Sequence, residues 1–253
     1  ACAAGGLIAA ANSPLGRVRT PFEKVRHSQS LLISLQACEA TMTERAWAQF
    51  QDARNQKASQ IDEERWNAFW TSEAVQQSLG RTTPLKDALQ SEAPVRWKEL
   101  SKRLQPGEDG HLNADAWYAV ESLLDRTASV GEALHFLVQT THALNRVSDA
   151  IATSRAERQN CLERDRQVIA LMRGHYVNTL QPLMSTGDPT LRTTSTALKE
   201  VIQALTPSEG IPEEMTAWAE QWRDGAAFQR YRAAIRTHAE RLSSVMTVCG
   251  ASM

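Results

Sequence analysis

The chain has 253 residues, 28 basic and 29 acidic side chains, and a formal net charge of −1 at pH 7. A hydrophobic share of 42% with 23% charged residues is typical of a folded protein and excludes an intrinsically disordered one. The balanced charge provides no overall attraction to nucleic acid. The longest strongly apolar run, Leu31–Leu35, is too short to span a bilayer. We therefore expect no nucleic-acid partner and no transmembrane segment.

The first 19 residues differ in composition from the rest. They are mostly small, they include Arg17 and Arg19, and no acidic residue occurs before Glu23. Three interpretations fit this composition: a lipid anchor at Cys2, as in bacterial lipoproteins; the region around an organellar presequence cleavage site; or a flexible tail. We therefore expect a flexible or processed segment at 1–19, then a single helical domain at 20–253. An exported (bacterial envelope) or organellar chain is favoured over a cytosolic one.

A first long helix is predicted over about 21–79. Thr20, Pro21 and Glu23 form the sequence pattern of a capping box with proline at the first helical position. Apolar residues then recur at spacings of three and four, with neither glycine nor proline until Gly80. Ser59 is a candidate cap at which this helix would divide into two.

A second long helix is predicted over 113–186. Asn113 is a good N-cap residue, Asp115 lies in the first turn, and the apolar stripe again has helical spacing. Gly131 is a candidate kink and Gly174 a candidate earlier end.

Shorter helices are predicted around these two, and no stretch has the alternation of a strand. Their ranges are 84–91, 94–104, 189–205, 212–222 and 226–248. The expected fold is all-α: an elongated antiparallel bundle built on the helices at about 21–79 and 113–186, with the shorter C-terminal helices packed along it.

The four cysteines, Cys2, Cys38, Cys161 and Cys249, include no C-x-x-C pair and allow three disulfide connectivities. Cys38 and Cys161 fall in predicted helical stretches, which favours free, buried thiols at both positions. Cys2 and Cys249 lie near the two termini, which often lie close together in space. The sequence does not choose among free, bridged and lipidated states.

The patterns that would indicate catalysis or a metal are incomplete. His135 and His142 share a helix face with Glu132, but only half of a di-iron motif is present. The turn at 109–113 resembles the second half of a calcium loop and lacks three of its carboxylates. The common phosphate-loop, dinucleotide, hydrolase and zinc-protease motifs do not occur. We expect no catalytic residue, no metal and no cofactor.

Two groups of residues are candidates for contact with a partner or ligand. Arg155 and Arg158 lie in a charged stretch where the apolar stripe thins, and arginine forks bind carboxylates and oxyanions. Trp66 and Trp70 lie four residues apart on one helix face, where core packing competes with an interface role.

Two functions compete. The first is a non-catalytic helical scaffold or interaction subunit with protein partners in a larger, membrane-associated assembly. The second is an extracytoplasmic, small-ligand-sensing helical bundle, which requires a transmembrane segment encoded next to these residues and arginine side chains buried between helices. An enzyme with a metal on the His135/His142 face is the weakest of the alternatives.

Overall fold

The structure is a computed structural model, and it describes residues 3–80, 84–105, 114–124, 129–157, 161, 163–206, 213–223 and 225–249. Every regular element among them is helical, and long helices pack together as a bundle, so the all-α class is confirmed. Contacts group the chain into two compact units where the sequence suggested one domain. Unit 1 comprises Ala1–Ser78, Glu99–Thr127 and Glu200–Ala219, and unit 2 comprises Leu79–Lys98, Ala128–Lys199 and Glu220–Met253.

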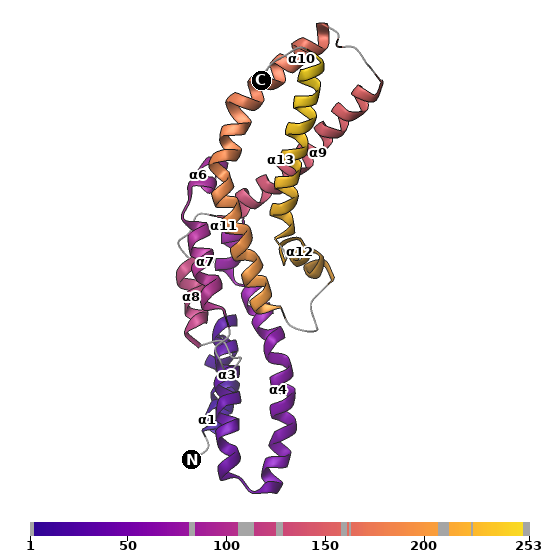
Figure 1. Cartoon of the computed structure of the whole chain (residues 1–253). Helices are drawn as coiled ribbons and strands as arrows, with labels where there is room; N and C mark the ends of the chain where they lie inside the picture. Colours follow the sequence, from indigo (N-terminus) through magenta and orange to yellow (C-terminus); the bar gives the residue numbers. More distant parts are fainter. Residues whose placement is uncertain are drawn as a thin grey trace. The chain divides into compact units, whose positions relative to one another are not determined.

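Unit 1 is organised on a hairpin of two long helices, α3 (Pro21–Cys38) and α4 (Glu44–Trp70), which Figure 1 shows side by side and joined at one end. The short 3-10 turn η1 (Glu39–Thr41) makes the connection. The other helices with residues in this unit are α1 (Ala4–Asn12), α2 (Pro14–Arg17), α5 (Glu73–Leu79), α7 (Ala93–Arg103), α8 (Ala114–Leu124), α11 (Gln181–Leu205) and α12 (Glu213–Arg223).

The start of α3 is the predicted capping box. The hydroxyl of Thr20 accepts a hydrogen bond from the backbone N–H of Glu23 at 3.3 Å, and the Glu23 carboxylate accepts from the backbone N–H of Thr20 at 2.8 Å. These bonds lower the pKa of Glu23. Before this cap the chain is also helical: Ala4, at the start of α1, is buried against Leu35 and Cys38 of α3. The expectation of a flexible or processed segment at 1–19 did not include this packing.

The first predicted long helix is wrong as a single element. It divides into α3, α4 and α5, and α4 runs unbroken through Ser59. The divisions fall at hydroxyl residues that cap the next helix, because the Thr43 side chain accepts from Ala46 N–H and the Ser72 side chain accepts from Val75 N–H. An acidic residue follows each cap in the first turn, which also favours a helix start there.

Unit 2 is built on α9 (Gly131–Glu157) and α13 (Ala226–Val248), which pack along each other. The third long element is a continuous helical run formed by α10 (Glu163–His175), the π-helical segment η2 (Tyr176–Leu180) and α11, and the short helix α6 (Leu85–Gln90) packs on α9. Their core contains Leu144 of α9, Met184 of α11 and Ala234 of α13.

The second predicted long helix is also wrong in its bounds. Separate helices α8, α9 and α10 replace its first part, and its last part continues past Thr186 through Pro189 to Leu205. A proline inside a helix leaves the carbonyl four residues earlier without its usual donor. That carbonyl belongs to Ser185, which is exposed, so water can satisfy it. The N-cap predicted at Asn113 lies outside the described residues.

Gly131 occupies a position with no room for a side chain. A Cβ atom there would meet the backbone carbonyl oxygens of Leu79 and Gly80, which are fixed groups. We expect Gly131→Ala to lower the free energy of unfolding by about 1–3 kcal/mol, the usual cost of overpacking. Gly174→Ala is the matched control, because its Cβ meets no atom of the described chain within 4 Å. Alanine should stabilise that helix slightly. Urea unfolding checks both, and equal effects of the two changes would contradict this account.

The bonding state of the cysteines differs from the expected one. Cys161 and Cys249 form a disulfide with a Cα–Cα distance of 5.1 Å, Cys38 is also disulfide-bonded, and no described cysteine is free. The prediction of free thiols at Cys38 and Cys161 was therefore wrong. Cys161 lies between α9 and α10, so its side chain is not held within a helix, and Cys249 directly follows α13. Helical periodicity carries no information about which helix ends, distant in the sequence, lie close together in the fold.

Candidate functional site

A cavity of about 480 Å³ lies within unit 1, between the α1–α2 segment and the α3–α4 hairpin. Sites for small molecules usually have volumes of about 300–1,000 Å³ and walls that are largely apolar, with a few polar groups. The cavity fits that description. Its apolar walls come from Ala11, Pro21, Val25, Leu31 and Ala68, and its uncharged polar groups are Ser28, Asn67 and Thr71.

The charged groups around this cavity are mostly positive. Arg19, Lys24 and Lys57 carry a positive charge, and Glu64 carries the one negative charge among the lining side chains. Lys57 and Glu64 form an ion pair, and both are partly buried. With His27 neutral, the lining therefore keeps a net positive charge, and the cavity favours an anion over a cation or a neutral molecule.

His27 is a lining residue with an unused hydrogen-bonding atom. Its Nε2 atom is buried and has no hydrogen-bond partner in the described chain. Burial lowers the pKa of His27, and the positive charges of Arg19 and Lys57 lower it further, while the Leu7 backbone opposes the shift. An anion in the cavity would offset those positive charges and raise the pKa of His27.

Helical spacing places these side chains on facing surfaces. On α4, Lys57 and Glu64 lie seven residues apart, and Ala68 follows four residues later, so the three share one face. On α3, His27 and Leu31 are likewise four residues apart. Sequence reasoning missed this site. The spacing was visible, but one helix over 21–79 cannot fold back on itself, and only the break at η1 brings the two faces together.

The two tryptophans predicted to contact a partner or ligand lie in the core of unit 1. Trp66 is 2% exposed and Trp70 is 9% exposed. Their ring centroids are 5.3 Å apart, and the Trp70 ring also meets Trp218 at 5.1 Å. Both rings fill the interior, so any ligand contact by them stays a prediction and would have to be made from within the core.

The two predicted arginines cannot be placed in a site. Arg158 lies outside the described residues, and Arg155 belongs to α9 without a described side chain. Their role stays a prediction.

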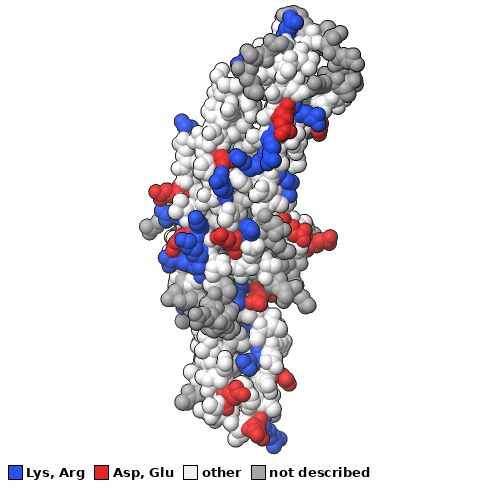
Figure 2. Space-filling model, in the orientation of Figure 1, with Lys and Arg blue, Asp and Glu red and all other residues white. Residues whose placement is uncertain are grey.

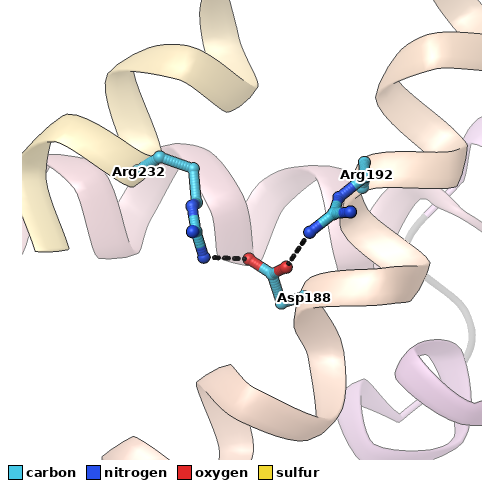
Figure 3. Close-up of polar contacts among 3 residues, drawn as sticks. All are labelled: Asp188, Arg192 and Arg232. Carbon is cyan, nitrogen blue, oxygen red and sulfur yellow. Dashed lines mark hydrogen bonds and ion pairs between the residues drawn. The ribbon is translucent and has the colours of Figure 1, made fainter.

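A separate polar cluster lies in unit 2. Asp188 of α11 accepts a hydrogen bond from Arg192 at 2.9 Å and another from Arg232 of α13 at 3.0 Å (Figure 3). Tyr231 is fully buried beside it. Burial and the charge of Asp188 both raise the Tyr231 pKa, and the hydroxyl has no partner in the described part of the chain. Each carboxylate oxygen of Asp188 has an arginine partner, so this cluster joins α11 to α13 and does not present a free ligand group.

A serine and a histidine also meet in the core of unit 2, but their geometry does not favour nucleophilic catalysis. Ser148 Oγ lies 3.3 Å from His238 Nδ1, and it donates its proton to the Leu144 carbonyl at 2.6 Å. Tyr176 of the π-helical segment lies against the imidazole with ring centroids 5.4 Å apart. Burial lowers the pKa of His238. The His238 imidazole is therefore packed in the core as a neutral ring.

The histidines considered for a metal are not assembled into a site. His135 is half-buried and His142 is exposed. Within the described ranges, no group of three or more histidine, cysteine, aspartate or glutamate side chains is placed to hold a metal ion.

Figure 2 shows basic and acidic side chains interspersed over the face in view. No helix in the described part of the chain is both long and apolar enough to cross a membrane.

These features define an all-α, disulfide-bonded protein with a basic cavity in one helical unit. The chain belongs to the DUF3080 family, described as "Protein of unknown function", which it matches over residues 1–253. No curated protein and no solved structure matches it significantly.

Proposed function

We propose that this protein is an extracytoplasmic helical bundle that binds a small organic anion in the basic cavity of unit 1. The observation that carries the proposal is the cavity itself, in which Arg19, Lys24, Lys57 and His27 surround apolar walls. The disulfide between Cys161 and Cys249 and the bonded state of Cys38 support an oxidising compartment, because structural disulfides persist mainly in exported proteins.

The lining selects for an anion that also has an apolar part. Val25, Leu31 and Ala68 offer surface to a hydrocarbon or aromatic body, and burying it contributes roughly 25 cal/mol per Å². Lys57 and Arg19 offer charge-assisted hydrogen bonds to a carboxylate. An aromatic or branched monocarboxylic acid meets both requirements, and benzoate is the simplest probe of this class.

Lys57→Gln tests the charge in the cavity. We expect it to weaken benzoate binding roughly 10- to 100-fold, because a hydrogen bond to a charged group contributes about 1.5–3 kcal/mol. Isothermal titration calorimetry measures the change. Lys24→Gln should act in the same direction, and it leaves the Lys57–Glu64 pair intact.

Lys102→Gln is the matched control, because Lys102 is exposed on α7 and does not line the cavity. It should bind benzoate as the wild type does. The proposal fails if all three variants bind equally, or if the wild type binds no member of a panel of aromatic and branched carboxylates.

A second function, a scaffold or interaction subunit of a membrane-associated assembly, has one specific observation in its favour. Leu15 and Val18, three residues apart, are 80% and 78% exposed, so two large apolar side chains are available on the surface of unit 1. Flotation with anionic vesicles separates the two functions: a protein that floats through Leu15 and Val18 supports the second. The lipid anchor at Cys2 lies outside the described residues and stays a prediction, which intact mass of the native protein tests.

A further inference from the structure

Arg65 of α4 is a buried arginine with a partly unused guanidinium. Its side chain is only 10% exposed. One nitrogen, Nη1, donates to the Asp62 carboxylate at 2.9 Å. The other two, Nε and Nη2, are buried and have no hydrogen-bond partner among the described residues. Buried polar groups nearly always have partners, so a pair of vacant donors on one charged group calls for an explanation.

The two vacant donors form a single recognition edge. Nε–H and one Nη2–H lie on the same side of the planar guanidinium and point in parallel, at a spacing that matches the two oxygens of a carboxylate. Asp62 holds the third nitrogen and so fixes the plane of the fork. Burial lowers the pKa of Arg65, yet arginine keeps its proton in proteins, so the edge remains cationic.

This edge is distinct from the basic cavity. Glu64 and Ala68 line the cavity, whereas Arg65 does not, because it lies about 100° around the helix from Glu64. Asp62, which holds Nη1, is 55% exposed, whereas Nε and Nη2 are themselves buried. A ligand therefore reaches this edge only when a neighbouring side chain moves.

We propose that the Nε/Nη2 edge of Arg65 is a binding site for the carboxylate of a small monocarboxylic acid. The fork gives two parallel hydrogen bonds to one carboxylate, and the low exposure limits the ligand to a small one. This inference does not depend on the cavity: it holds or fails whether or not benzoate binds beside Lys57.

The test is a titration of the full-length, ¹⁵N-labelled protein with sodium acetate at constant ionic strength, followed through the arginine Nε–H signals in NMR spectra. The Arg65 signal should shift and saturate at millimolar acetate. The signal of Arg45, which is exposed on α4, should shift weakly and without saturation. An Arg65 signal that stays fixed, or that follows the Arg45 signal, overturns the proposal. Tighter saturation by sulfate than by acetate overturns the carboxylate assignment.

Two variants complete the test. Arg65→Lys keeps the charge and removes the fork, so the saturable response to acetate should disappear from the backbone amide signals around position 65, which the wild type should show. Asp62→Asn keeps the fork and removes the competing negative charge, so saturation should occur at a several-fold lower acetate concentration. Because Asp62 is half-exposed, this variant tests the site even where Arg65→Lys fails to fold. An Asp62→Asn protein that needs more acetate than the wild type contradicts the proposed geometry.

Discussion

Removal of the disulfide between Cys161 and Cys249 should lower the free energy of unfolding by about 3–5 kcal/mol. The two cysteines are 88 residues apart, and cross-linking a loop of that length restricts the unfolded chain strongly. The bond also joins Cys249, directly after α13, to Cys161, which lies two residues before the start of α10. It is close to the small core of Ile169, Leu242 and Met246. Urea unfolding of the Cys161→Ser/Cys249→Ser double variant measures the effect.

A reducing agent provides the control for that experiment. Dithiothreitol should abolish the difference between wild type and double variant, because both proteins then lack the bond and any effect of reduction at Cys38 is common to them. A difference below about 1 kcal/mol in oxidising buffer, or one that persists after reduction, would contradict the role given to this disulfide.

Trp66→Ala should lower the free energy of unfolding by about 3–5 kcal/mol, the usual cost of removing a buried aromatic ring. The ring is 2% exposed and packs against Trp70, so the change leaves a cavity in the core of unit 1. The matched control is Ile33→Ala on the exposed face of α3, which should change stability by less than about 0.5 kcal/mol. Thermal and urea unfolding both report the difference.

The same pair of variants separates a packing role from a binding role. If Trp66 serves a partner more than the core, Trp66→Ala should unfold as the wild type does. Trp66→Phe offers a milder change for the case in which the alanine variant does not fold. It should retain most of the stability, because an aromatic ring still fills most of the space.

Local signals in the sequence were enough to predict the fold class and the positions of many helix ends. The capping box at Thr20 and Glu23 is present with both of its hydrogen bonds. The last helix, predicted at 226–248, coincides with α13. The capping box and the bounds of α13 depend on a few residues that are neighbours in the sequence. The same residues determine these features in the folded chain, so they could be predicted.

Features that depend on distant contacts were not predictable in the same way. The break at η1 is set by Thr43 as a cap and by the packing of α4 back on α3, and helical periodicity continues through it. The partner of Cys161 is 88 residues away. The basic cavity follows from the hairpin, so its residues could be seen in the sequence only as lysines and a histidine on two helix faces and an arginine just before α3.

The unpartnered Nε/Nη2 edge of Arg65 could not be predicted from the sequence, for another reason. Arginine next to Glu64 and three residues after Asp62 has the appearance of a surface ion pair on a helix. Only the fold shows that this side chain is buried and that one of its nitrogens alone is engaged. It is nevertheless the kind of buried arginine that a ligand-binding helical bundle requires.

A crystal structure of the protein grown with 4-bromobenzoate tests the central claim most directly, because bromine reports its position by anomalous scattering. We predict a peak in the unit 1 cavity, with the bromophenyl ring against Val25 and Leu31 and the carboxylate within hydrogen-bond distance of Lys57 or His27. A cavity that holds only water at saturating 4-bromobenzoate would contradict the proposed function. A peak beside Arg65 alone would also contradict it, and would leave the inference about Arg65 standing.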